Sequence, residues 1–376
     1  MNSQARLALA RLALKKKRNL CEPTTMVTER ALRGEASKMQ SDDGKKPDVF
    51  IVGAPKCGTS AMDQYLAAHP DIYMAEKEMH AFGSDLRFGR QFYRRNREAY
   101  LAEFAGRNGE RRAGEASVWY LFSTRAAAEI HAFNPEARVI IMLREPAEML
   151  YSLYHQFRFD GNEHLPTFEQ ALAAEAERRA GRRITRQTYL AQGLVYRETA
   201  RYTEQVRRYF DVFGRKRVQV IIYDDLAADA RGVYRRTLEF LGVDSTRIET
   251  DFPVINGNKS VKHSALRSLL NDPLVRSTAV AIGRRLPRPL FVALHDAERR
   301  LWKFNSRSAK RPPLAPEVRA QLQREFAPEV ERLSELLGRD LTHWSSPIPP
   351  VAEPLSCLRV DSYEPRSGKS ILTAAK

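Results

Sequence analysis

A glycine-bearing loop between an apolar run and a helix-like segment constrains the fold of this chain more than any other feature. The loop reads GAPKCGTS over residues 53–60, with apolar residues 49–52 before it and a helical pattern over residues 60–68 after it. Gly53 and Gly58 allow the backbone to turn tightly and aim N–H groups at an anion, and the positive end of the following helix adds to the attraction. The stretch predicts a strand–loop–helix unit whose loop binds phosphate.

Strand-like and helix-like segments then alternate as far as residue 241. Residues 49–52, 138–143 and 218–223 are short apolar runs rich in β-branched residues, the pattern of strands buried on both faces of a parallel sheet. Helical patterns cover residues 60–68, 123–133, 146–159, 168–180, 196–210 and 228–241, with a further long helix near 316–337. The alternation predicts an α/β, P-loop-like three-layer fold, with a central parallel sheet flanked by helices and a ligand site at the carboxyl ends of the strands.

The composition divides the chain into a basic leader, a folded domain and a tail. We expect residues 1–46 to be a disordered leader, residues 47–345 to form the domain, and residues 346–376 to be a disordered tail. The leader also fits a short amphipathic helix over residues 1–18 that lies on an anionic membrane. Its basic residues, unaccompanied by acidic ones before residue 20, are Arg6, Arg11, Lys15, Lys16, Lys17 and Arg18.

Charge and cysteine content limit the partners and the compartment. The net charge of +16 favours anionic partners, which include nucleotides, nucleic acid, acidic glycans and membrane surfaces. No stretch approaches the roughly 20 apolar residues that a transmembrane helix needs. Cys21, Cys57 and Cys357 are too few and too scattered for a disulfide framework or a zinc site, so we expect a reducing, cytoplasmic setting.

The lysine of the loop does not stand where a nucleoside triphosphatase has it. In those enzymes a lysine directly follows the second glycine, and the next Ser or Thr holds magnesium. Here Thr59 takes that place and the lysine, Lys56, lies inside the loop. The pattern favours a shorter anion with a single 5′ phosphate. An ordinary strand-to-helix turn with Lys56 in solvent is the other interpretation.

A second anion site is predicted after the second clear strand. Arg144 follows residues 138–143, and Ser152 lies about two turns into the next helical segment. A guanidinium and a hydroxyl in this arrangement can hold a second phosphate. Asp224 and Asp225 follow the third strand and imitate the magnesium-binding carboxylate of a triphosphatase.

Five motifs follow one another along the chain: GAPKCGTSAMDQYLAAHP, EKEMHAFGSD, GEASVWYL, VIIMLREPAEMLYSLY and VIIYDDL. In this order they resemble the sulfotransferase family that uses 3′-phosphoadenosine 5′-phosphosulfate (PAPS). The resemblance covers about residues 47–245, with weaker support to about residue 340. Its closest type is the carbohydrate sulfotransferases related to heparan sulfate enzymes, whose Lys-Glu-x-His-x-Phe pattern is matched by residues 77–82.

The resemblance implies a donor site that needs no metal. The first loop holds the 5′ phosphosulfate, the Arg144 and Ser152 pair holds the 3′ phosphate, and the basic loop NGNKSVKH closes over the 3′ phosphate or is a mobile surface loop. Lys56 would stabilise the charge that grows on the departing nucleotide, adenosine 3′,5′-bisphosphate. We expect the Cys57 side chain to pack and not to react. The implied donor-binding residues are Lys56, Cys57, Gly58, Thr59, Ser60, Arg144, Ser152, Lys259 and Lys262.

The resemblance also implies the chemistry. Glu78 is the general base that takes the proton of an acceptor hydroxyl on a sugar or glycolipid, and His80 orients the acceptor or acts as the base instead. Together with Lys56, these are the predicted catalytic residues.

Several positions depart from the family pattern. Ala116 stands where relatives often have a lysine, so Lys77, Lys259 or another cation must supply that charge, or the acceptor geometry differs. Met149 replaces a second arginine, and Gly83 stands at an acidic position, with Asp85 two residues on. The neighbouring aromatic residues, 119 and 120, contact adenine or acceptor, or belong to the core.

Two alternatives to a sulfotransferase stay open on the sequence. One is a magnesium-dependent nucleotide kinase or triphosphatase that uses Asp224 or Asp225. The other is a non-enzymatic protein that binds nucleic acid or membrane through residues 1–18 and 266–311. The leading interpretation involves no nucleic acid.

Overall fold

The computed structural model describes residues 46–89, 96–185, 188–247, 251–253, 259–261, 306–308 and 311–346. All of these except Lys46 belong to one compact unit, Pro47–Lys376. The predicted leader, apart from Lys46, and the predicted tail from residue 347 onward lie outside the described residues, as does Lys262.

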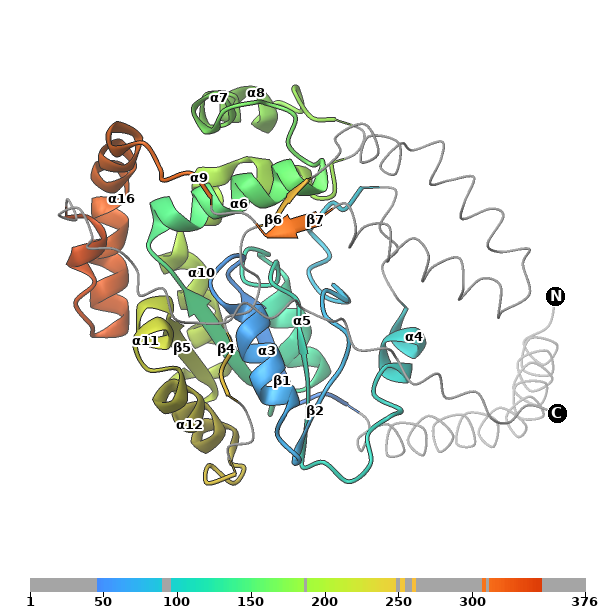
Figure 1. The fold of residues 1–376 in the computed structure, drawn as a ribbon. Helices are drawn as coiled ribbons and strands as arrows, with labels where there is room; N and C mark the ends of the chain where they lie inside the picture. The colour runs from blue at the N-terminus through green and yellow to red at the C-terminus, as the bar shows by residue number, and fades with distance from the viewer. Residues whose placement is uncertain are drawn as a thin grey trace, which may run out of the picture. The chain divides into compact units, whose positions relative to one another are not determined.

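A five-stranded parallel sheet in the order β2-β3-β1-β4-β5 forms the centre of this unit (Figure 1). Its central strand pairs on both sides, with Ile51 opposite Ala116 of β3 and Ile140 of β4. The chain leaves β1 toward β2 and β3 but leaves β4 toward β5, so the strand order reverses between β1 and β4, where α/β sheets bind ligands. The strands are β1 (Val49–Gly53), β2 (Ile72–Met74), β3 (Arg112–Ala116), β4 (Arg138–Leu143) and β5 (Val218–Ile222).

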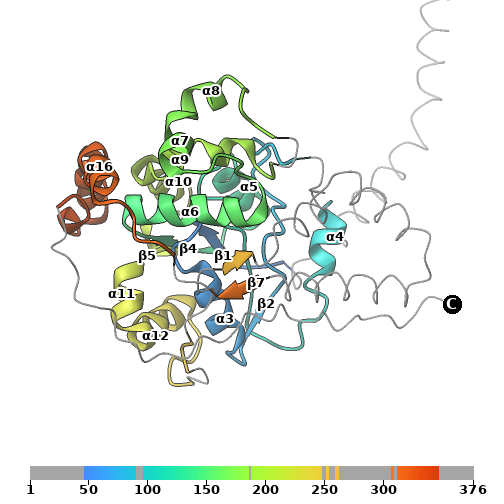
Figure 2. The ribbon, with the colours of Figure 1, turned by 45° about the horizontal axis from the view of Figure 1, so that its top comes forward.

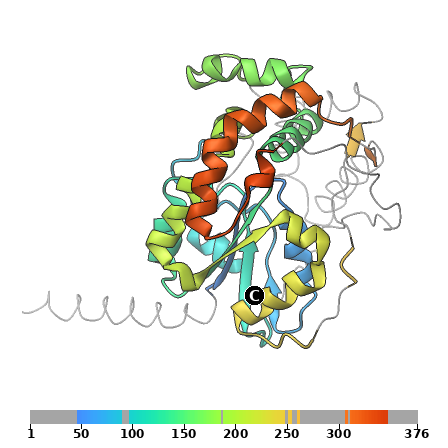
Figure 3. The ribbon, with the colours of Figure 1, turned by 90° about the vertical axis from the view of Figure 1, so that its left-hand side faces the viewer.

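Helices cover both faces of the sheet, which confirms the predicted fold class. In Figure 3, α3 (Thr59–Ala67) and α12 (Ala230–Leu241) lie on one side, and α5 (Ala126–Phe133) and α10 (Tyr202–Phe213) on the other. The last long helix, α16 (Pro316–Leu337), packs against α10. The fold therefore has three layers.

Helix α6 (Pro146–Asp160) begins just beyond the carboxyl end of β4 and lies across that edge of the sheet (Figure 2).

Two predicted helices are interrupted: residues 168–180 form α7 and α8, and residues 196–210 fall in α9 and α10. The remaining described elements are α4 (Arg97–Ala102), α7 (Phe168–Ala173), α8 (Glu175–Arg179), α9 (Tyr196–Thr199), α11 (Tyr223–Ala228), the 3₁₀ turns Ala191–Leu194, Arg215–Arg217 and Thr342–Trp344, and the antiparallel pair β6 (Lys259–Val261) and β7 (Ser306–Ser308).

The sequence analysis found β1, β4 and β5 but missed β2 and β3. Strand β3 reads RAGEA and contains no β-branched residue, yet its last four residues are buried. Gly114 is needed there because a Cβ would lie 3.0 Å from the carbonyl oxygen of Val49 and 2.8 Å from the sulfur of Met74. Close packing between strands, and not β propensity, selects this segment.

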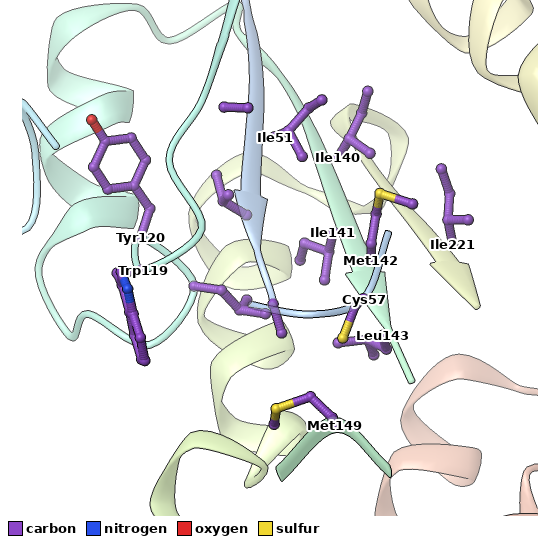
Figure 4. Close-up of a cluster of buried hydrophobic side chains, with 14 of the residues drawn as sticks. Ile51, Cys57, Trp119, Tyr120, Ile140, Ile141, Met142, Leu143, Met149 and Ile221 are labelled. Carbon is purple, nitrogen blue, oxygen red and sulfur yellow. The ribbon is translucent and has the colours of Figure 1, made fainter. Parts of the chain in front are cut away.

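The apolar side chains of β1, β4 and β5 continue into the core beneath the glycine loop. Figure 4 shows Cys57 beside Met142 and Leu143, with Met149 nearby. All four side chains are fully buried. The loop therefore rests on a packed floor, which limits its movement.

Gly53 lets the segment after β3 cross the end of β1. The N–H of Leu121 donates to the carbonyl of Val52 at 2.8 Å. At Gly53, φ is +143°, and a Cβ would lie 2.5 Å from the carbonyl oxygen of Val118. No side chain fits there without moving backbone.

We expect Gly53→Ala to lower the free energy of unfolding by about 2 kcal/mol or more, because backbone strain and a backbone clash combine. Urea denaturation measures the loss. Gly109→Ala is the matched control, since φ is +91° there but nothing lies within 4 Å of an added Cβ. Equal losses in the two variants would contradict the role of the crossing segment.

Candidate active site

The loop between β1 and α3 curls over the N-terminal end of α3. Lys56 and Gly58 adopt left-handed backbone conformations, with φ of 65° and 90°. The Lys56 side chain turns away from bulk solvent, and its Nζ donates to Oε1 of Gln156 on α6 at 3.0 Å. Thr59 is buried and Ser60 is half-buried. The loop thus has the cradle shape that the glycine spacing predicted.

Four basic side chains from separate segments converge on this cradle. Lys77 Nζ donates to Ser60 Oγ at 2.9 Å, at the start of α3. Burial lowers the pKa of Lys56 to about 8; Asp160 opposes the shift, and the cations Lys77, Arg311 and Arg144 add to it. Mutual repulsion among these cations is relieved by a bound anion. The arrangement therefore fits a ligand with several negative charges.

Arg144 lies at the carboxyl end of β4, as predicted. Its guanidinium stacks on the Tyr223 ring with the central carbon 4.6 Å from the ring centroid. Its Nη2 is 3.3 Å from Oε2 of Glu148, and Ser152 is buried one turn further along α6. The ring, the carboxylate and the helix hold the guanidinium in one orientation.

The C-terminal part of the chain supplies two arginines that the sequence analysis did not single out. Arg311 Nη2 lies 2.5 Å from Oε2 of Glu148, and its guanidinium is 4.9 Å from the Tyr151 ring centroid. Arg319 on α16 also pairs with Glu148. Burial would raise the pKa of Glu148, but Arg311, Arg144 and Arg319 outweigh it and lower that pKa. Arg311 and Glu148 are 163 residues apart, so no local pattern could have paired them.

Glu78 follows β2 and faces the cradle from the other side. Its Oε2 accepts from the N–H of Val118 at 3.2 Å, and its Oε1 lies 3.7 Å from Lys77 Nζ. Burial would raise the pKa of Glu78, but the hydrogen bond with His80 and the charge of Lys77 outweigh it and lower that pKa. About a third of the side chain is exposed. Glu78 is therefore an accessible, ionised carboxylate beside the anion site.

His80 lies behind Glu78 and is fully buried. Its Nε2 is 3.1 Å from Oε2 of Glu78 and hydrogen-bonds to the hydroxyl of Tyr189. A side chain without exposed surface in this position orients Glu78. The alternative that His80 itself is the base stays a prediction, and its geometry gives it less access to an acceptor than Glu78 has.

Three predicted contact residues belong to the core. Burial raises the pKa of Cys57 to about 12, and its Sγ donates to the carbonyl of Pro55 at 3.4 Å, so the thiol packs as expected. Trp119 is buried and stacks on Phe157 with an interplanar angle of 15°. Tyr120 is fully buried. Of the two roles left open for the aromatic pair, the structure favours the core.

The structure also shows where the residues that depart from the family pattern lie. Ala116 is buried in β3. Lys77, one of the cations named as a replacement for the family lysine, lies on the cradle, and its role as that replacement stays a prediction. Asp85 accepts from Ser123 and Thr124 and thereby holds the turn before α5. Lys259 begins β6, and its side chain, like the whole of Lys262, is outside what the structure describes.

Asp224 and Asp225 are engaged by the C-terminal segment. Asp225 forms an ion pair with Arg339, and Asp224 accepts from the indole N–H of Trp344 at 2.8 Å. These contacts fasten the end of α16 to α11. They do not favour the alternative in which either carboxylate holds magnesium for a triphosphate.

Known proteins are similar to this chain in sequence and in fold. A family profile described as "Sulfotransferase domain" matches residues 46–282. The chain is similar to a solved sulfotransferase from Alicyclobacillus acidocaldarius, with a TM-score of 0.59 and 33% identity over 80% of this chain and 99% of that one.

Two mouse proteins are also similar to this chain. Heparan sulfate glucosamine 3-O-sulfotransferase 3A1 is 25% identical over 305 residues, which are 80% of this chain and 65% of that protein. Carbohydrate sulfotransferase 15 is 33% identical over 153 residues, which are 30% of this chain and 27% of that protein. The chain thus spans less than two thirds of the length of either. Within the described residues, no helix is both long and apolar enough to span a bilayer.

The pKa of Lys56 predicts proton-linked binding of adenosine 3′,5′-bisphosphate. Free Lys56 is largely neutral at pH 9, and a bound anion favours its charged form, so binding should take up as much as about one proton there. Affinity should be full below pH 8 and fall by up to about tenfold per pH unit above it. Calorimetry in two buffers of different ionisation enthalpy measures the uptake.

Lys56→Arg is the control, because a guanidinium stays charged across this range. Its binding should take up little or no proton at pH 9 and keep a flat affinity from pH 7 to 9. Unchanged uptake in Lys56→Arg would assign the proton to another group.

Proposed function

The chain belongs to the sulfotransferase domain family, and from this premise we propose that it moves the sulfuryl group of PAPS to a hydroxyl of a carbohydrate or glycolipid acceptor. One observation carries the proposal: Lys56, Lys77, Arg144 and Arg311 converge opposite the carboxylate of Glu78, at the carboxyl ends of β1 and β4. A cationic pocket with one accessible base suits an anionic donor and a neutral hydroxyl.

The donor would be held at two places. The cradle with Lys56 and Lys77 receives the 5′ phosphosulfate, and Arg144, Ser152 and Arg311 receive the 3′ phosphate. Backbone N–H groups at the start of α3 and bidentate guanidinium groups are the usual partners of phosphate oxygens. The donor supplies an electrophilic sulfur and a nucleotide leaving group.

The chain's residues then divide the work of the transfer. The acceptor oxygen forms a bond to sulfur while the bond from sulfur to the bridging oxygen of the 5′ phosphate breaks. Glu78 takes the hydroxyl proton, and Lys56 stabilises the negative charge that develops on the bridging oxygen. His80 keeps the Glu78 carboxylate pointed at the acceptor.

A carbohydrate acceptor is supported by the relatives' own names, which specify heparan sulfate glucosamine and carbohydrate. Cytoplasmic location and contact of residues 1–18 with an anionic membrane stay predictions.

The direct test of the acceptor is transfer of labelled sulfate from PAPS to a panel containing a glucosamine-bearing glycan, a neutral oligosaccharide, a glycolipid and a simple phenol. Labelling of the phenol alone would overturn the carbohydrate assignment.

Donor recognition can be tested with two nucleotides. Arg144→Ala and Arg311→Ala should each weaken the binding of adenosine 3′,5′-bisphosphate by about 2 kcal/mol or more. Ser152→Ala should weaken it by about 1 kcal/mol. Binding of adenosine 5′-phosphate should change little, because it lacks the 3′ group. Calorimetry measures both. If Arg144→Ala weakened the binding of the two nucleotides equally, Arg144 would not recognise the 3′ phosphate.

The role of Glu78 is tested by separating chemistry from binding. Glu78→Gln keeps the size of the side chain but cannot take a proton, so turnover should fall by about a hundredfold or more while bisphosphate affinity stays constant. Initial rates and calorimetry on the same preparation measure the two quantities. Normal turnover in Glu78→Gln together with an inactive His80→Ala would transfer the role to His80.

A further inference from the structure

The loop that carries Glu78 has a backbone conformation that its own residues disfavour. Glu78 and His80 have φ of 61° and 46°, in the left-handed region, although neither is glycine. Each such residue costs about 1 kcal/mol or more. Contacts from outside the loop must therefore hold residues 78–82, which we call the base loop.

Alternate amides of the base loop donate to the end of β3 and to the segment that follows it. The N–H of Glu78 donates to the carbonyl of Ala116 at 2.8 Å. The N–H of His80 donates to Ser117 Oγ at 3.1 Å, and that of Phe82 donates to the Tyr120 hydroxyl at 3.3 Å. Two of these three acceptors are hydroxyl oxygens, which can rotate and present a hydrogen instead.

Both hydroxyls are oriented by one buried carboxylate, Glu115. Ser117 Oγ donates to its Oε2 at 2.8 Å, and the Tyr120 hydroxyl donates to its Oε1 at 3.1 Å. Tyr100 on α4 donates to the same Oε1 at 2.8 Å. Glu115 is fully buried, and no basic side chain in the described part of the chain forms an ion pair with it.

The number of hydrogens on each group decides which groups in this network donate and which accept. A hydroxyl has one hydrogen, so a hydroxyl that donates to Glu115 presents only lone pairs to the loop amide. An ionised carboxylate accepts from all three hydroxyls at once. A carboxamide carries donors on one of its two arms, so at least one hydroxyl would have to reverse and direct its hydrogen toward a loop N–H.

We propose that Glu115 is a positioning residue for the reaction. By orienting the hydroxyls of Ser117 and Tyr120, it fixes the conformation of the base loop and thereby the position of the Glu78 carboxylate. The inference rests on the proposed function, in which Glu78 is the base. Val118, which donates to Glu78 Oε2, directly follows Ser117, so a change at Ser117 moves the donor that fixes the carboxylate. Displacement of a base by about 1 Å can cost a hundredfold in rate.

The chain offers a matched control in Tyr100. Tyr100→Phe removes a hydrogen bond to Glu115 and keeps the aromatic ring, but Tyr100 accepts from no amide of the base loop among the described hydrogen bonds. If Glu115 only stabilised the fold, Glu115→Gln and Tyr100→Phe would behave alike. If Glu115 positions the base, kcat falls in Glu115→Gln and stays unchanged in Tyr100→Phe.

The experiment measures kcat, the acceptor KM, bisphosphate affinity, unfolding free energy and the pH profile of kcat for Glu115→Gln, Ser117→Ala and Tyr100→Phe. We expect kcat to fall about tenfold or more in Glu115→Gln and Ser117→Ala, with bisphosphate affinity within about twofold of wild type. The acid limb of kcat, which reports ionisation of Glu78, should move to higher pH because the carboxylate loses hydrogen bonding. Tyr100→Phe should lose stability but keep kcat and the acid limb.

Three outcomes would overturn the inference. They are wild-type kcat in a folded Glu115→Gln, wild-type kcat in Ser117→Ala, and an equal loss of kcat in Tyr100→Phe. Ser117→Ala decides the matter if Glu115→Gln does not fold. An inactive Glu78→Gln beside a fully active Ser117→Ala would reject the inference alone, whereas an active Glu78→Gln would reject the proposed base itself.

Discussion

Repulsion among the basic groups of the anion site is the constraint around which the rest of the structure is arranged. Burial lowers the pKa of Lys56 most, and the charges of Lys77, Arg311 and Arg144 lower it further. Glu148 offsets this repulsion by pairing with Arg144 and Arg311, and Asp160 offsets it near Lys56. Gln156 adds a neutral acceptor for the Lys56 ammonium group. All three lie on α6. This helix therefore supplies both carboxylates and the amide oxygen that lie against the cations.

The fold also gives different tasks to chemically identical side chains. Glu78 is partly exposed and ionised, which suits a base. Burial raises the pKa of Glu115, and the hydrogen bonds from Ser117, Tyr100 and Tyr120 act against that rise and hold the carboxyl group in the core. Glu148 serves as a counter-charge for arginines. Environment, and not residue type, decides which glutamate meets the substrate.

The C-terminal segment completes the site from outside the matched family region. Helix α16 brings Arg319 to Glu148, and the residues just before it bring Arg311. At its other end, Arg339 and Trp344 bind Asp225 and Asp224 on α11. The segment is therefore fastened at both ends, which gives Arg311 a defined position beside α6.

Local pattern was sufficient for the parts of this protein whose chemistry lies within a few consecutive residues. The apolar runs of β1, β4 and β5 and the glycine cradle with Lys56 could be predicted in this way, because strand burial and anion binding impose short-range patterns. The Lys77-Glu78 pair was predicted only through the family resemblance of residues 77–82. Strand β3, the use of Lys77 on the cradle, and the pairing of Arg311 with Glu148 could not. They depend on packing and charge between segments distant in sequence, and only the folded chain brings those segments within reach of one another.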